Sequence, residues 1–277
     1  MRVLVPYFIG SGDMVSSTVA EADQPEWVAG STYSAGTLVQ RTPVHRVFSR
    51  ITTGGGTTPP EADATTWQDR GATIRWAMWD GSVGTHTTAS GSLSTTVAIS
   101  GAADTVALLD VTGSSVSVSG AGGSGSASVP SHGTVLLSGL GMGSGNVTVS
   151  VSGGGTVQVG ACMIGTFTDL GTTLAGPKLG MTDKSKRSFD AFGRPTLVKR
   201  AFQRADEYQI VFPTANLDLV AGALTAVRSQ AVLWVGIDWL GTSALYGLCT
   251  DWSLTRKAGE MSTGAIKISS LAMGVQL

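Results

Sequence analysis

The side chains that could carry out chemistry are few and scattered in this sequence. Its three histidines, His45, His86 and His132, are each alone, with no His-Glu-x-x-His motif, no paired His and no Cys neighbour at the spacing of metal ligands. Asp104 and Asp110 are six residues apart in a strand-like region and could in principle face one sugar, although solvated turn positions are the simpler interpretation. No Gly-x-Ser-x-Gly nucleophile motif is present. The sequence therefore predicts no catalytic residue, no metal site and no cofactor.

A Gly-x-Gly-x-x-Gly string occurs at Gly120, Gly122 and Gly125. In a dinucleotide site this motif ends a strand and opens a helix, whose N-terminal amide groups and dipole meet the pyrophosphate. Here the string is followed by Ser-Ala-Ser-Val-Pro at residues 126–130, which does not favour a helix. We therefore interpret the string as a hairpin loop between two strands.

An aromatic segment near the N-terminus is the most informative feature of the chain. Between Trp27 and Trp67 the sequence has Tyr33, then a short strand-like stretch and a Gly/Thr loop closed by two prolines. A segment of this length has little apolar surface to bury, so a few large side chains must form its centre. We predict a small β-module over residues 25–71 whose core contains Trp27, Val39 and Trp67.

The order of these residues is Trp, Tyr-x-x-Gly-x-x-Val, an aromatic strand, a Gly loop, Pro and a final Trp. It resembles the small carbohydrate-binding modules of chitinases and cellulases, families five and twelve. The resemblance implies stacking of aromatic rings on sugars, and it makes Tyr33, His45 and Phe48 the candidate sugar contacts, although Phe48 could equally belong to the core. Arg50 and Ile51 stand where sugar-binding relatives expose rings, so a packed spacer or docking module is the alternative.

The composition excludes several classes of function. The net charge is −1 and charged residues make up 13% of the chain, which leaves no basic footprint for nucleic acid or an anionic membrane surface. No stretch approaches the roughly twenty apolar residues needed to span a bilayer, and the N-terminus does not resemble a signal peptide. We expect no membrane insertion and synthesis in a cytoplasm, with Cys162 and Cys249 as buried free thiols.

The middle of the chain has the pattern of strands separated by Gly-rich turns. From residue 81 to residue 168 the only charged residues are two aspartates. Valines alternate with small hydroxyl residues, which predicts half-buried strands whose valines point inward: Val116, Val118, Val147, Val149 and Val151. Recurring short strands favour an antiparallel β-sandwich or jelly roll over residues 72–175. Few charges protect its edges, which suits a protein inside an assembly.

The remaining parts of the chain differ in pattern. Residues 1–24 are expected to form an N-terminal strand followed by a polar arm, and residues 76–80 an apolar segment with alternate residues facing the core. Residues 176–277 have a normal mix of charges and predict an α+β domain with one helix over residues 214–228, capped by Thr214. The predicted fold class is therefore mainly β.

A short basic string, Lys184-Ser185-Lys186-Arg187, lies between Asp183 and Asp190. Such runs are usually solvated loops, and the alternative is docking to an acidic surface of a neighbouring subunit. The sequence does not decide between these two interpretations.

Further strings are distributed from residue 13 to about residue 271: SSTVAE with EW, TYSAGTLV, HRVF, RWAMWDGSVGTHTT, VALLDV, KSKRSFDAFGRPTLVKRAF and VLWVGIDWLGTSALYGLCTDWSL. Together they resemble a family of bacteriophage tail proteins of the long-tailed type, found around the tail tip and baseplate. The resemblance implies a structural protein of the virion, with other tail or baseplate proteins as partners. Sugar binding by the module would rely on multiple copies around the tail axis and a host-surface glycan. A purely architectural connector and, less strongly, a glycan-active enzyme are the alternatives.

Overall fold

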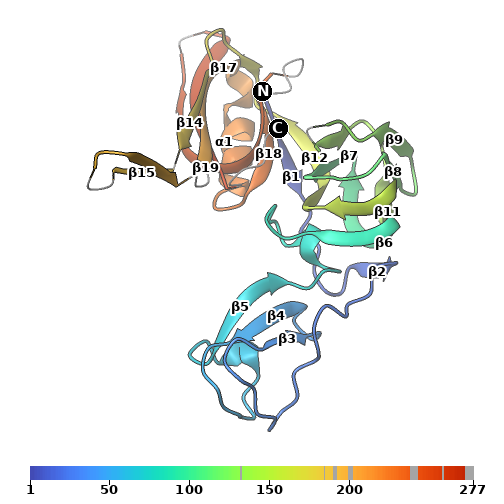
Figure 1. The fold of residues 1–277 in the computed structure, drawn as a ribbon. Coiled ribbons are helices and arrows are strands. Elements are labelled where there is room, and N and C mark those ends of the chain that lie inside the picture. The colour runs from blue at the N-terminus through green and yellow to red at the C-terminus, as the bar shows by residue number, and fades with distance from the viewer. Residues whose placement is uncertain are drawn as a thin grey trace. The chain divides into compact units, whose positions relative to one another are not determined.

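The computed structural model describes residues 1–131, 133–183, 185–189, 192–198, 202–237, 243–257 and 259–271. Its fold is mainly β, with 55% strand and 8% helix, as the sequence predicted. Two compact units form, one from residues 7–164 and the other from residues 1–6 together with 165–277 (Figure 1). The sequence had instead suggested four ranges with boundaries after residues 24, 71 and 175. His132, Lys184 and Asp190 lie outside the described residues.

Within residues 7–164, the expected module is a three-stranded antiparallel sheet of β3 (Leu38–Arg41), β4 (Arg46–Arg50) and β5 (Trp67–Ala72). A 3-10 turn, η1 (Pro60–Ala62), begins at a proline, whose fixed φ suits the first position of a helical turn. Val39, Phe48 and Trp67 form a buried cluster, and Trp27 and Tyr33 pack against it while partly exposed. A few large side chains thus form the centre of this sheet.

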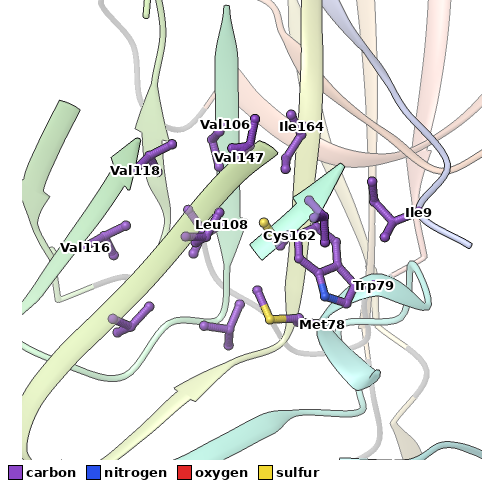
Figure 2. Close-up of a cluster of buried hydrophobic side chains, with 14 of the residues drawn as sticks. Ile9, Met78, Trp79, Val106, Leu108, Val116, Val118, Val147, Cys162 and Ile164 are labelled. Atoms are coloured by element: carbon purple, nitrogen blue, oxygen red, sulfur yellow. The ribbon is translucent and has the colours of Figure 1, made fainter. Parts of the chain in front are cut away.

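The rest of this unit is a β-sandwich. One sheet has the order β2-β6-β11-β8-β9, with β2 (Met14–Ser17), β6 (Thr87–Ala103), β11 (Gly143–Val159), β8 (Ser115–Ser119) and β9 (Ser124–Ser128). The same core receives side chains from β7 (Thr105–Leu109), β10 (Val135–Leu137) and the first residues of β12 (Ala161–Asp169). Figure 2 shows part of this core, in which Val116 and Val118 of β8 belong to the same buried cluster as Val106 and Leu108 of β7 and Ile164 of β12.

Alternation places the predicted valines in the sandwich core. Each is at most 2% exposed: Val116, Val118, Val147, Val149 and Val151. The small hydroxyl residues of the other face pair across strands, as Thr96 does with Thr148 at 2.8 Å. Strands β8 and β9 pair with Ser119 opposite Ser124, so Gly120 and Gly122 lie in a hairpin loop, as predicted, whereas Gly125 belongs to β9.

The segment around Trp76 does not alternate as expected. It contains a 3-10 turn, η2 (Ala77–Trp79), and Trp76, Met78 and Trp79 are all buried. A 3-10 turn has three residues per turn, so successive side chains point in different directions instead of to two faces. The predicted alternation is therefore wrong at this position.

The other unit is an antiparallel sheet with a helix. In sheet order its strands are residues 165–169 of β12, β1 (Arg2–Pro6), β18 (Val232–Val235), β19 (Ala244–Thr255), β20 (Met261–Ser270) and β17 (Phe202–Pro213), with β13 (Thr172–Thr173) and β14 (Lys178–Asp183) both paired to β17. Helix α1 (Leu217–Ala226), the one α-helix in the described part of the chain, places Val220 and Leu224 in the core of this unit. The N-terminal strand β1 lies inside this sheet, between β12 and β18.

Helix α1 begins three residues after the predicted cap. Thr214 instead opens a 3-10 turn, η3 (Thr214–Asn216), and its hydroxyl lies 3.1 Å from the Gly259 carbonyl oxygen and 2.9 Å from Ser262 Oγ. Asn216, at the position before the helix, makes no side-chain capping hydrogen bond. The predicted Thr214 cap is wrong because this side chain bonds to residues distant in sequence instead.

Strands β15 (Lys186–Phe189) and β16 (Pro195–Val198) form a separate two-stranded hairpin in this unit, and Figure 1 shows it extending away from the larger sheet. Cys162 is buried and Cys249 partly buried, and both are free. Among the residues that the structure describes, no helix is both long and apolar enough to cross a lipid bilayer.

Candidate functional site

The three candidate sugar contacts are not brought together. Phe48 is 3% exposed and belongs to the core of the module, so its ring cannot stack on a sugar. His45 comes directly before β4, whereas Tyr33 forms a bridge with Gly54, beyond the other end of that strand. Tyr33 and His45 therefore line two different pockets.

The first pocket, here named the Trp27–Tyr33 pocket, has a volume of about 180 Å³. It is lined by Trp27, Ser31, Tyr33, Arg50, Gly55, Gly56, Thr58, Asp63 and Trp67. The Tyr33 ring meets the Trp67 indole edge to face, with ring centroids 5.3 Å apart. The Val28 amide donates a hydrogen bond of 2.8 Å to Tyr33 Oη, which fixes the position of the phenol ring.

Arg50 supplies a positively charged wall to this pocket. It is only 7% exposed, and its guanidinium lies 4.9 Å from the centre of the Trp67 ring. Its Nε donates to the Thr52 carbonyl oxygen and its Nη1 to Thr66 Oγ1, both at 2.8 Å. A buried guanidinium held by two hydrogen bonds and an aromatic face is rigid, and rigid donors favour specific recognition.

Asp63 supplies the opposite charge. Its carboxylate accepts hydrogen bonds from the hydroxyls of Thr65 and Thr66 and from the Thr66 amide. These bonds hold the pKa of Asp63 below its ordinary value, and the bond from the Thr65 hydroxyl has the largest effect. Asp63 is therefore a carboxylate at neutral pH. The pocket thus combines aromatic walls with a fixed donor group and a fixed acceptor group. In the sequence, Arg50 is only a departure from the sugar-binding pattern, and no motif there indicates that Asp63 belongs to the site.

The second pocket, here named the His45–Trp76 pocket, has a volume of about 540 Å³. Its lining is mostly apolar and includes Phe8, Ile9, Pro43, Val44, Trp76 and Trp79, with His45, Arg46 and Asp80 as charged or titratable members. The His45 ring stacks on the Trp76 indole with ring centroids 4.2 Å apart and an interplanar angle of 23°. His45 therefore lies in a pocket lined by the module and by the chain segments before and after it.

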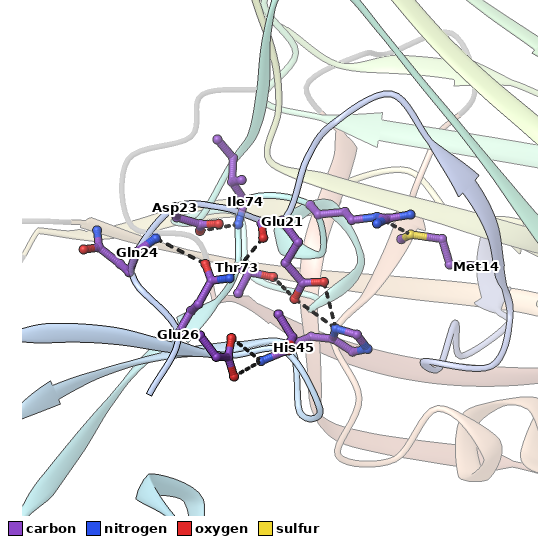
Figure 3. Close-up of polar contacts among 11 residues, drawn as sticks. Met14, Glu21, Asp23, Gln24, Glu26, His45, Thr73 and Ile74 are labelled. Carbon is purple, nitrogen blue, oxygen red and sulfur yellow. Dashed lines mark hydrogen bonds and ion pairs between the residues drawn. The ribbon is translucent and has the colours of Figure 1, made fainter. Parts of the chain in front are cut away.

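A set of polar contacts holds His45 in place (Figure 3). Its Nδ1 lies 2.9 Å from a carboxylate oxygen of Glu21, and that same oxygen accepts a hydrogen bond of 2.8 Å from Thr73 Oγ1. Close by, the Ile74 amide donates to the Asp23 carboxylate at 2.6 Å. These contacts join the chain where it enters the module to the chain where it leaves it, so His45 has an anchoring role.

No protein-family model and no curated protein sequence matches this chain.

The carboxylates singled out in the sequence do not form a glycosidase pair. Asp104 and Asp110 flank strand β7 at its two ends, and six residue steps along a strand span about 20 Å. A glycosidase pair requires separations of roughly 5–10 Å. Asp110 instead contacts His86 Nε2 at 2.6 Å. Within the described ranges, no group of three or more His, Cys, Asp or Glu residues is placed to hold a metal ion.

Proposed function

We propose that this chain is a non-enzymatic structural component of a bacteriophage tail tip or baseplate, and that its β-module binds a host-surface glycan through the Trp27–Tyr33 pocket. The observation that carries the sugar-binding part is the composition of that pocket: aromatic walls beside the buried Arg50 guanidinium and the Asp63 carboxylate. A sugar ring offers an apolar C–H face and a rim of hydroxyl groups, which match aromatic walls and fixed polar groups respectively.

The assignment to a tail rests on different support. The sequence strings described above resemble tail-tip and baseplate proteins over most of the chain. The sandwich has two charged residues between positions 81 and 168, which is unusual for a protein surface that stays in water. One small pocket binds a sugar weakly, so several copies around a tail axis would provide the required avidity. This role places the protein in the virion after synthesis in the host cytoplasm.

Filling the pocket tests the sugar-binding proposal. Thr58 is exposed and lines the pocket, so Thr58→Trp introduces an indole into about 180 Å³ without removing a core contact. We expect glycan affinity of the full chain, presented in many copies on beads, to fall at least about tenfold. Binding is measured on insoluble chitin, on cellulose and on an array of bacterial surface polysaccharides.

The matched control for this experiment is Thr57→Trp. Thr57 is the preceding exposed residue and does not line the pocket, so this variant should bind as the unchanged chain does. Equal binding by both variants would refute the pocket as the sugar site. Absence of binding to every glycan would favour the architectural connector.

Deleting the module tests its role in the virion. The chain enters and leaves the module at adjacent points, because the Ile74 amide bonds to the Asp23 carboxylate at 2.6 Å. A short linker can therefore replace residues 25–71 without separating the flanking backbone. We expect tails with this deletion to assemble and to adsorb poorly to host cells, as measured by electron microscopy and adsorption kinetics.

Two other results of this deletion would contradict the proposal. Tails that fail to assemble would show the module to be architectural. Tails that assemble and adsorb normally would remove the host-binding role. Immunogold labelling of intact particles tests the tail assignment separately, since a chain absent from the tail tip and baseplate is not part of either.

A further inference from the structure

The C-terminal unit contains a segment of exposed strands within residues 178–198, here named the arm. Every described residue of β14, β15 and β16 is exposed. In the hairpin, Arg187 is opposite Leu197 and Phe189 is opposite Pro195, and directly opposite residues of antiparallel strands share a face. One face of the hairpin therefore carries Phe189, Pro195 and Leu197 beside Arg187, with Phe189 61% and Leu197 70% exposed.

This face has the character of a binding surface. A two-stranded hairpin cannot bury an apolar face by itself, and contiguous exposed apolar side chains mark interaction sites. The Arg187 guanidinium lies 5.1 Å from the centre of the Phe189 ring, so a positive charge accompanies the aromatic group. The sequence of the arm, residues 178–198, contains five Lys or Arg and two Asp. The surface that covers the arm should therefore be apolar and acidic.

The unit of residues 7–164 has both properties. It contains ten Asp or Glu and five Arg. Its His45–Trp76 pocket has an exposed apolar rim, with Phe8 90% and Val44 37% exposed. Trp76 and Trp79 line the pocket, and their buried indole Nε1 atoms find no acceptor in the described part of the chain. Buried hydrogen-bond donors in a protein core almost always have an acceptor. Two indole donors without one indicate a surface that a partner covers.

The charges at this pocket complement those of the arm. Asp80 lines the pocket and is exposed, and its carboxylate oxygens accept hydrogen bonds from the Ser82 amide and the Thr85 hydroxyl. The one basic side chain in the described lining, Arg46, lies 2.5 Å from Asp69 and also acts on Asp80, so two carboxylates share one guanidinium and the site keeps a net negative charge. An aromatic ring flanked by a guanidinium thus fits an aromatic pocket flanked by a carboxylate.

We propose that the arm of one copy of this chain docks on residues 7–164 of a second copy, with Phe189 in the His45–Trp76 pocket and Arg187 beside Asp80. The two patches differ, so the contact is heterologous and continues from copy to copy into a ring or a filament. The inference goes beyond the proposed function, since neither a glycan nor another tail protein takes part. Sugar binding and self-association are separated by point variants, because Thr58→Trp changes the Trp27–Tyr33 pocket and leaves the lining of the His45–Trp76 pocket unchanged.

Sedimentation velocity of the full chain over a range of concentrations tests this contact. We expect reversible self-association that weakens as salt is added, because salt screens exposed charges. Phe189→Ser combined with Leu197→Ser should weaken association at least about tenfold. Val198→Ser is the matched control, because Val198 is 46% exposed and lies on the opposite face of the hairpin. A chain that stays monomeric throughout, or association that the double variant leaves unchanged, would overturn the proposal.

The pocket side has its own variants. Val44→Arg places a positive charge at the rim that meets the basic arm, so it should weaken association as the double variant does. Ile51→Arg is its control, since Ile51 is 47% exposed on the same module and does not line the pocket. Equal effects of these two variants would overturn the assignment of the pocket.

Disulfide trapping shows whether the arm docks on a second copy or on its own chain. One copy carries Phe189→Cys and the other Val44→Cys, both with Cys249→Ser, while Cys162 is buried and burial raises the pKa of its thiol. We expect a disulfide-linked dimer in the mixture and little from either copy alone. If a single chain carrying both new cysteines instead forms only a cross-linked monomer, the arm docks within its own chain and the proposal is wrong.

Discussion

Replacing Trp67 with alanine is expected to lower the free energy of unfolding of the module by about 3–5 kcal/mol, the usual cost of truncating a large buried aromatic side chain. Trp67 is 3% exposed, and it is one of three residues in the buried cluster with Val39 and Phe48. The Tyr33 ring and the Arg50 guanidinium also pack on its indole. With so few core members, no other large side chain can fill the cavity that the substitution leaves.

Hydrogen exchange measured by mass spectrometry localises this effect. The amides of β3 and β4 should exchange much faster in Trp67→Ala, while those of the C-terminal unit keep their protection. Trp252→Ala is the matched control, since Trp252 lies on β19 and is 39% exposed. Unchanged protection of β3 and β4 in Trp67→Ala would contradict the assignment of this residue to the core. Loss of the core should also abolish the Trp27–Tyr33 pocket, because Tyr33 rests on Trp67.

The features predicted well from the sequence depend on local pattern. Strict alternation of valine with serine or threonine identifies the buried face of β8 and β11, because the side-chain period of a strand is two. Apolar residues at helical spacing predicted α1, because residues three or four positions apart lie on one face of a helix. These signals need only neighbouring residues, so one sequence contains them in full.

The features that the sequence did not predict depend on partners distant in the chain. Strand β1 pairs with β12 and β18, so the first residues belong with the C-terminal unit although nothing in their local pattern indicates it. Thr214 bonds to Gly259 and Ser262, which removes it from its expected capping role. Such contacts are set by the tertiary fold, and local propensity cannot anticipate them.

The candidate site also combines features that follow from local sequence with features that depend on strand pairing. Tyr33 lines a pocket, and its predicted contact with sugar stays a prediction, whereas Phe48 is turned into the core by the pairing of β3 with β4. Arg50 stands opposite Trp67 in the β4–β5 pairing, so the guanidinium takes the place of an exposed ring as a wall of the pocket. Asp63 joins it through a turn whose hydrogen bonds involve Thr65 and Thr66. Recognising that set from sequence would have required the strand register.

Val118→Asp is expected to destabilise the sandwich by more than about 4 kcal/mol, because it places a carboxylate among apolar side chains with no partner. Val118 is 2% exposed and belongs to the cluster that includes Val116, Val147 and Ile164. The adjacent Ser117 is exposed on the other face of β8, opposite Ser150 and Ser126. Ser117→Asp places the same charge in solvent and should change the free energy of unfolding by no more than about 0.5 kcal/mol.

Denaturant unfolding of the two variants, followed by circular dichroism and tryptophan fluorescence, measures this difference. The comparison is sensitive to register, because a shift of one residue in a strand exchanges its two faces. If Ser117→Asp were the more damaging substitution, β8 would pair one residue out of the register in which Val118 lies opposite Val149. If both were harmless, the valine-rich face of β8 would not be buried and the sandwich would not form the core described here. Only a large loss for Val118→Asp together with near-neutrality of Ser117→Asp agrees with the alternating pattern from which the sandwich was predicted.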